Sequence, residues 1–135
     1  MADKLQFSLV SPSREVFSGE VDHVVAPGTD GEFGVLANHA PFMTTLKTGV
    51  VRVLDGDVAR MRLFVRGGFA DVTPAGLTIL AEEAVNLDGV DGAEVGSQLA
   101  AAREKLLSEG ADSPHRTALQ EEIDYLEALR SAISA

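Results

Sequence analysis

The side chains best suited to acid–base chemistry in this sequence are its three histidines. They are His23, His39 and His115. His39 follows Asp30 and Glu32 closely, and a histidine paired with a carboxylate can act as a general base. No G-x-S-x-G motif accompanies it, the chain contains no cysteine, and no H-E-x-x-H spacing indicates a metal site. A small hydrolase that uses His39 and a carboxylate, without metal or cofactor, is therefore one hypothesis, and a structural or interface role for His39 is the other.

A glycine-rich segment before His39 has a spacing that predicts a sharply folded loop. Its glycines are Gly28, Gly31 and Gly34. Glycine adopts positive φ angles at low cost, so this spacing suits tight turns. Glu32 and Phe33 stand between the glycines, and we expect an exposed carboxylate and an exposed ring at the tip of the loop, as on a contact surface. A second irregular segment is expected at 38–42, where a proline cannot donate to a β-ladder.

The composition of the 135-residue chain limits its class and its partners. The formal net charge is −10, which disfavours nucleic acid or an anionic lipid surface as a direct partner and suits a basic protein partner. No stretch has the length of a membrane span or the apolar core of a signal peptide. The absence of cysteine fits a reducing cytoplasm. We therefore expect a chain that works through protein contacts.

Up to Asn86 the hydrophobic pattern is that of short β-strands. Leu5, Phe7 and Leu9 alternate with polar residues, as in a strand with one buried face. Later apolar runs are separated by residues that favour turns. The predicted turns lie at 18–19, 55–57, 67–68 and 74–76. This succession predicts a β-sandwich or a flattened barrel.

Beyond Asn86 the period of the apolar residues becomes helical. One apolar stripe spans 95–106, with Gly110 as the predicted C-cap. A second stripe spans 119–133, and Ser113 followed by Pro114 predicts the start of its helix. Two amphipathic helices with a short connection predict an antiparallel hairpin. We therefore expect a β-domain and a helical hairpin. They are residues 1–86 and 87–135.

The glycine-rich segment, read with its neighbours, resembles a known family. Residues 28–42 read G-T-D-G-E-F-G-V-L-A-N-H-A-P-F, which resembles the G-x-x-G-E-x-G-I-x-x-x-H-A-P segment of the ε subunit of F-type ATP synthases, called δ in mitochondria. Residues 10–19 resemble its opening pattern, V-[ST]-P-x-x-x-V-[FY]-x-G, and residues 65–69 resemble its glycine-pair segment. The fold implied by the resemblance is a β-sandwich of about ten short strands followed by a two-helix hairpin.

In this family the subunit is not a catalyst but part of the central stalk of the rotor. The resemblance implies that the chain binds the γ subunit and the c-ring, and that it helps to couple proton-driven rotation to ATP synthesis. It also implies a peripheral position at the cytoplasmic face of a bacterial plasma membrane, with membrane contact only through the complex. The residues that fall at the c-ring contact are Gly31, Glu32 and Phe33. Those that fall at the γ contact are Ser11, His39, Phe42 and Thr44.

The nucleotide motif of the family is altered in this chain. Many bacterial members bind ATP through [IL]-D-x-x-R-A at the start of the hairpin. The matching stretch has the following residues at the four defined positions: Leu87, Asp88, Asp91 and Gly92. An aspartate repels phosphate where an arginine would bind it, so we expect no ATP site. Arg103 on the same helix is an alternative phosphate ligand, and a free-standing nucleotide-responsive regulator is a third hypothesis.

The inhibitory helix of the family is altered as well. In many members the second helix reaches the α and β subunits and blocks hydrolysis, partly through basic side chains. In this chain residues 114–135 carry only Arg116 and Arg130 as cations, against four carboxylates. We therefore expect at most a weak regulatory role for the hairpin, through contacts with α and β.

Overall fold

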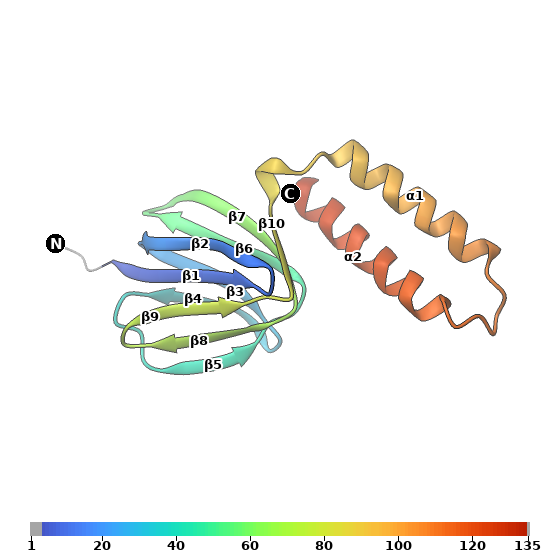
Figure 1. Ribbon diagram of the computed structural model, residues 1–135. Coiled ribbons are helices and arrows are strands. Elements are labelled where there is room, and N and C mark those ends of the chain that lie inside the picture. Colours follow the sequence, from blue (N-terminus) through green and yellow to red (C-terminus); the bar gives the residue numbers. More distant parts are fainter. Residues whose placement is uncertain (1–3, 135) are drawn as a thin grey trace. The chain divides into compact units, whose positions relative to one another are not determined.

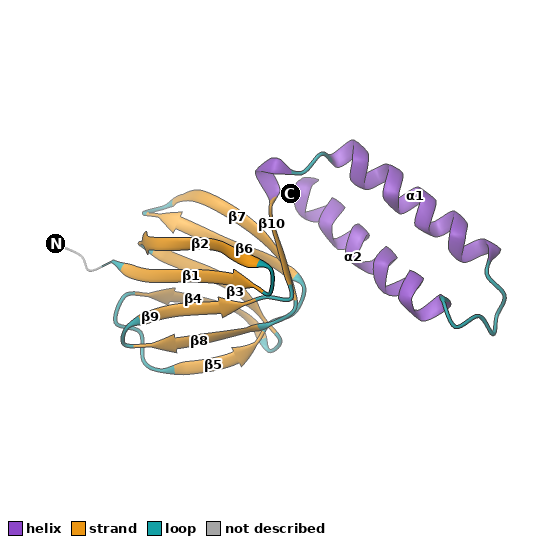
Figure 2. Cartoon of the chain, in the orientation of Figure 1, coloured by secondary structure: helices purple, strands orange, loops and turns teal. Residues whose placement is uncertain are grey.

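The computed structural model describes residues 4–134, and the chain forms two compact units, 1–88 and 89–135 (Figure 1). Within the described residues, the first unit contains ten strands and the second contains two α-helices (Figure 2). The strands are β1 (Leu5–Ser11), β2 (Arg14–Val21), β3 (His23–Gly28), β4 (Gly31–Leu36), β5 (Phe42–Thr45), β6 (Gly49–Asp55), β7 (Val58–Arg66), β8 (Phe69–Thr73), β9 (Gly76–Leu80) and β10 (Glu83–Asn86). The helices are the 3-10 helix η1 (Leu87–Gly89), α1 (Gly92–Ser108) and α2 (Arg116–Ser134). None of the helices within 4–134 is long and apolar enough to cross a membrane.

The strands form two five-stranded sheets, which confirms the predicted β-sandwich. Sheet A has the order β2-β1-β9-β8-β5, and sheet B has the order β10-β7-β6-β3-β4. Neighbouring strands are antiparallel except β1 and β9, which are parallel. Strands β4 and β5 follow one another in the chain but form edges of different sheets. Residues 37–41 therefore join the two sheets along one side of the sandwich.

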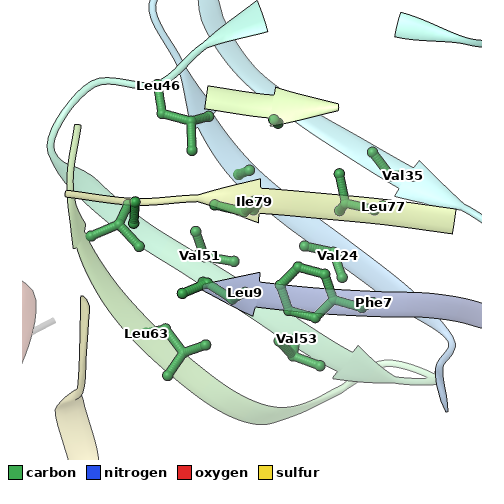
Figure 3. Close-up of a cluster of buried hydrophobic side chains, with 14 of the residues drawn as sticks. Phe7, Leu9, Val24, Val35, Leu46, Val51, Val53, Leu63, Leu77 and Ile79 are labelled. Atoms are coloured by element: carbon green, nitrogen blue, oxygen red, sulfur yellow. The ribbon is translucent and has the colours of Figure 1, made fainter. Parts of the chain in front are cut away.

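The core of the first unit lies between the sheets. Phe7 and Leu9 of β1 are fully buried and point toward sheet B, where Val51 and Val53 of β6 face them (Figure 3). Complete burial of a side chain of this size contributes roughly 1.5–3 kcal/mol. Each of these strands therefore has one face that is fixed by the core, which is why alternation in the sequence predicted them.

The turn predicted at 18–19 is wrong, because β2 continues through these residues. They pair with Phe7 and Ser8 of β1, and pairing along a neighbouring strand overrides the local preference of a Ser-Gly pair for a turn. The chain turns instead at Asp22, between β2 and β3. The other predicted turns are confirmed. They lie at 55–57, 67–68 and 74–76.

The glycine pair between β7 and β8 marks the point where the chain passes from sheet B to sheet A. Gly67 and Gly68 have φ angles of 64° and 112°, values that other residues rarely adopt. A Cβ atom at Gly68 would lie 2.0 Å from the carbonyl oxygen of Leu80. The N–H of Leu46 donates to the carbonyl oxygen of Gly68 at 2.8 Å, which fixes the bend further. The glycines are therefore a steric requirement of the crossing.

The end of α1 differs from the prediction. The guanidinium of Arg116 donates to the carbonyl oxygens of Leu106 and Glu109, at 3.3 and 3.1 Å. The carbonyl of Leu106 also accepts from the N–H of Glu109 at 3.2 Å, so the carbonyl at the helix end for which Arg116 supplies the donor is that of Glu109. The C-cap residue, Glu109, is extended, and Gly110 does not adopt the positive φ expected of a glycine cap.

The hairpin prediction for the second unit is confirmed. Helix α2 begins at Arg116, two residues after the predicted Pro114. The hydroxyl of Ser113 accepts a hydrogen bond from the N–H of His115 at 3.1 Å, so the predicted capping residue does contact the start of the helix. Between the helices, Nη2 of Arg103 lies 2.9 Å from Oε1 of Glu127.

Asp22 joins two segments of the first unit that are distant in sequence. One of its carboxylate oxygens accepts from Lys4, and the other accepts from the backbone N–H of Gly56 at 2.7 Å. The hydrogen bond from Lys4, followed by that from Gly56, holds the pKa of Asp22 below its usual value of 3.8. The turn between β6 and β7 is thus tied to the start of β1 and β3.

We expect Asp22→Asn to lower the free energy of unfolding at neutral pH and to weaken its dependence on acid. A carboxylate with a depressed pKa in the folded state stabilises the fold above its unfolded pKa, and this stabilisation is lost as the pH falls through the folded value. The difference between wild type and Asp22→Asn should be complete at pH 7 and shrink below about pH 4. Thermal melts from pH 7 down to about pH 2 measure it, with Asp57→Asn as the control. A difference that is the same at every pH contradicts the interpretation.

Candidate functional site

The glycine-rich segment is a tight β-hairpin. Gly28 at the end of β3 pairs with Gly31 at the start of β4, and Thr29 and Asp30 form the turn between them. Gly31 has a φ angle of 131°, which explains the glycine at this position. The sharp turn is confirmed, but Glu32 lies in strand β4 and not at the tip of a loop.

Glu32 is exposed, and its carboxylate forms an ion pair with Arg52 on β6. Oε1 of Glu32 lies 2.9 Å from Nη2 of Arg52, and the two side chains are 57% and 41% exposed. Glu32 is opposite Pro27 and Arg52 is opposite Val25, both on β3. Arg52 therefore reaches across β3 to the edge strand. The sequence located the carboxylate on the surface but gave no signal for its partner, which is 20 residues away.

Phe33 is half-buried, and the expectation of an exposed ring is wrong. Successive side chains of a strand point to opposite faces, so Phe33 points inward where Glu32 points outward. Its ring packs against the core, in space that Gly28 leaves free: a Cβ at Gly28 would lie 3.0 Å from the ring. The ring also meets Phe42 edge-on, with 5.5 Å between the ring centroids and 68° between the planes.

The β3–β4 hairpin is attached to the end of β5. The N–H of Thr29 donates to the carbonyl oxygen of Thr45 at 3.1 Å, and their hydroxyls lie 2.9 Å apart. The N–H of Lys47 donates to the carbonyl oxygen of Pro27 at 3.0 Å. These bonds, and the contact between Phe33 and Phe42, place the start of β4 next to β5. The start of β4 carries the residues expected at the c-ring, and β5 carries Phe42 and Thr44, which are expected at γ.

Strand β5 is the exposed edge of sheet A. Phe42 is 43% exposed, and Met43 is 66% exposed. Thr44 is half-buried opposite Ala70 of the core. Met43 was not predicted at this edge, because residues 38–42 were expected to be irregular and β5 begins at the last of them. A strand of four residues is too short to show a periodic signal.

Ser11 lies apart from this edge, at the end of β1. It is 8% exposed, and its hydroxyl donates to the carbonyl oxygen of Arg14 at 3.3 Å, so its side chain offers little to a partner. It borders an apolar groove of about 410 Å³ that is also lined by Val10, Phe69 and Leu80. Phe69 and Leu80 are paired residues of β8 and β9 and are 39% and 41% exposed. No sequence pattern singled out these two residues, because Phe69 begins and Leu80 ends an otherwise ordinary strand.

His39 is half-buried in the connection between β4 and β5, and its ring is not oriented by a carboxylate. Its Nδ1 lies 2.7 Å from the carbonyl oxygen of Ala40, and its ring centroid lies 6.4 Å from that of Phe42. The nearest candidate in the hydrolase hypothesis, Glu32, is paired with Arg52 instead. Residues 4–134 contain no group of three His, Cys, Asp or Glu side chains that could hold a metal ion. The geometry does not support a hydrolase.

Asp91, which stands at the arginine position of the expected nucleotide motif, is the N-cap of α1. Its carboxylate accepts a hydrogen bond from the N–H of Ala93 at 2.9 Å. Val90 and Asp91 also form a second aliphatic–aspartate pair, and a motif that begins there has Glu94 at the arginine position. Both registers therefore place a carboxylate where the family has a phosphate ligand. The other motif residues, Leu87 and Asp88 in η1 and Gly92 at the start of α1, supply no cation.

The comparisons with known proteins identify one family. The family model described as "ATP synthase, Delta/Epsilon chain, beta-sandwich domain" matches residues 4–87. An ATP synthase epsilon chain of Hyphomonas neptunium is 67% identical over 134 residues, which are 99% of each chain. One of Caulobacter vibrioides is 69% identical over 83 residues, which are 61% of this chain but 94% of its own length.

A solved structure agrees with these relatives. A chain in the Euglena gracilis mitochondrial ATP synthase, in a structure of its OSCP, F1 and c-ring, is 26% identical with a TM-score of 0.79, over 96% of this chain and 81% of that one. The structural match therefore covers residues of both the strands and the helices. The chain belongs to the delta/epsilon chain family of ATP synthases, and it is a non-catalytic subunit of that complex.

Proposed function

We propose that this chain is a central-stalk subunit that binds the γ subunit and the c-ring and helps to couple proton-driven rotation to ATP synthesis. The observation that carries the proposal is the attachment of the β3–β4 hairpin to β5, which joins the two expected contact regions in one edge of the sandwich. A rotor subunit has to transmit torque without yielding, and a close-packed, hydrogen-bonded edge suits that task.

The c-ring side of the proposal rests on the hairpin. Gly31 and Glu32 are both exposed at the start of β4, and the outward-pointing carboxylate of Glu32 suits the basic polar loops that such rings commonly carry. Phe33 supports the contact from inside the sandwich, because its ring is packed against the core and against Phe42.

The γ side of the proposal rests on sheet A. Met43 on β5 is exposed on the same face of sheet A as Phe69 and Leu80 beside the groove, and a partner could cover this apolar face. Phe42 points to the opposite face of β5 and is 43% exposed at the edge of the sandwich. Thr44 lies on the same strand, and His39 lies in the connection that leads to it. Ser11 contributes through the wall of the groove, since its hydroxyl is bonded within the chain.

The proposal places the chain at the periphery of the complex, on the cytoplasmic face of a bacterial plasma membrane. The hairpin would reach the α and β subunits with a weak regulatory role. One of the two cations in 114–135, Arg116, already holds the end of α1 and offers less charge to an acidic partner.

We expect the fragment 1–86 to fold and to bind γ with an affinity close to that of the full chain. The core and all the residues expected at γ lie within it. The Caulobacter relative supports this expectation. The 83 matched residues make up 94% of that relative, so its whole chain is about as long as the first unit of this one. Co-purification of γ with the fragment, and with the full chain as control, measures it. An insoluble fragment, or one that loses γ, would show that the hairpin is part of the binding domain.

We also expect no tight binding of MgATP by the purified chain. A carboxylate near a triphosphate replaces an attraction by a repulsion, and reversing one charge at 4 Å changes the interaction by about 2 kcal/mol even in water, or roughly thirtyfold in affinity. Asp91 is also engaged as the N-cap, and Arg103 is paired with Glu127. Isothermal titration calorimetry decides the matter: a dissociation constant in the micromolar range would refute the prediction.

A further inference from the structure

The carboxylate of Glu32 is already paired with a cation of the same chain. Glu32 and Arg52 form a neutral pair on the surface of sheet B, with 2.9 Å between their charged atoms. A basic loop that approaches Glu32 therefore meets a carboxylate that already has a cation. To bind, the loop has to share the carboxylate with Arg52 or displace it.

The cost of displacement is low. Both side chains are about half exposed, and exposed ion pairs of this kind contribute only about 0–1 kcal/mol. Arg52 stands directly opposite Arg62 on β7, and like charges that face each other across two strands repel. The guanidinium of Arg52 is therefore attracted by Glu32 on one side and repelled by Arg62 on the other.

We propose that Arg52 is an intramolecular competitor for Glu32, and that it sets how strongly Glu32 binds a basic partner loop. The inference rests on the proposed contact between Glu32 and the c-ring. In the free chain, Arg52 holds the carboxylate and neutralises it. In the complex, a cation of the partner takes over the carboxylate, and Arg52 is released toward solvent.

The variant that tests the inference is Arg52→Gln, which keeps most of the side chain and removes its charge. Association of the full chain with a detergent-solubilised c-ring is measured at low ionic strength, where exposed charges are least screened. We expect Glu32→Gln to weaken binding and Arg52→Gln to strengthen it by about twofold to fivefold, because one competing cation is removed. The double variant should bind like Glu32→Gln alone, since Arg52 acts only through Glu32.

Arg60→Gln is the matched control. Arg60 is on β7 next to the turn between β6 and β7, it is paired with a different carboxylate, that of Asp55 at 3.7 Å, and its removal changes the net charge by the same amount. It should leave the affinity unchanged. If Arg60→Gln strengthens binding as much as Arg52→Gln does, the effect is one of net charge and the inference is wrong.

The remaining outcomes separate the inference from the proposed function. If Arg52→Gln weakens binding, Arg52 orients Glu32 and does not compete for it, which overturns the inference alone. If Arg52→Gln strengthens binding equally with and without Glu32, the two residues act independently, which also overturns it. If Glu32→Gln leaves the affinity for the c-ring unchanged, the proposed contact is absent, and the inference fails with it.

Discussion

Replacing Gly68 by alanine should destabilise the first unit by several kcal/mol. Gly68 has a φ angle of 112°, and the added Cβ would lie 2.0 Å from the carbonyl oxygen of Leu80 and 2.8 Å from the Cα of Ala81. Both obstacles are backbone atoms, so they cannot move aside as a flexible side chain does. Backbone strain of this kind costs about 1–3 kcal/mol, and overpacking costs a similar amount. The sum is a large part of the 5–15 kcal/mol typical of a folded domain.

Gly56→Ala is the control for this prediction. Gly56 also has a positive φ, 62°, but a Cβ there would have nothing within 4 Å. Its replacement should cost only about 1 kcal/mol, from the left-handed backbone alone. Urea denaturation of the two variants gives the comparison. Equal midpoints would mean that the crossing between the sheets is not held by the close approach at Gly68.

The first strand and the turn after β6 could be predicted from local patterns alone. Leu5, Phe7 and Leu9 are all buried, and the turn at 55–57 joins two strands as expected. The spacing of Gly28, Gly31 and Gly34 predicted a sharply folded loop, yet only Thr29 and Asp30 form a turn, and β4 begins at Gly31 by pairing with β3. Pairing of this kind is a tertiary effect that no local pattern contains.

In the candidate site, too, some features could be predicted from the sequence and others depend on strand pairing. The sequence indicated that Glu32 is exposed, because a glycine-rich turn needs no buried carboxylate, but it placed Phe33 beside Glu32 on the surface. Alternation along β4 puts Phe33 inside. Arg52 could not be predicted, since its role depends on the register of three strands. The end of α1 shows the same limit: Gly110 looked like a cap, whereas Arg116 of the next helix performs that task.

Glu32→Lys should weaken the coupling of proton flow to ATP synthesis and leave the fold intact. The substitution replaces the proposed attraction to a basic c-ring loop by a repulsion, a change of about 2 kcal/mol at 4 Å in water. It also places a second cation beside Arg52, which adds to the positive charge of this edge. The side chain is 57% exposed, and surface substitutions usually change stability by less than about 0.5 kcal/mol. The thermal midpoint of the purified variant should therefore stay close to that of the wild type.

Asp57→Lys is the matched control for Glu32→Lys. Asp57 lies in the turn between β6 and β7, exposed like Glu32. That turn follows the end of β6, whereas the start of β6 lies near Pro27, the residue opposite Glu32. The control therefore makes the same change in net charge at the other end of the sheet. We expect it to leave coupling unchanged.

The central claim, that the sandwich couples rotation through its β3–β4 edge, is tested most directly by ATP-driven proton pumping in inverted membrane vesicles. Pumping is divided by ATP hydrolysis in the same vesicles, and the content of assembled complex is checked by quantifying the chain together with γ. The account predicts a clearly lower ratio for Glu32→Lys and a wild-type ratio for Asp57→Lys, with normal assembly of both. A wild-type ratio for fully assembled Glu32→Lys would contradict it.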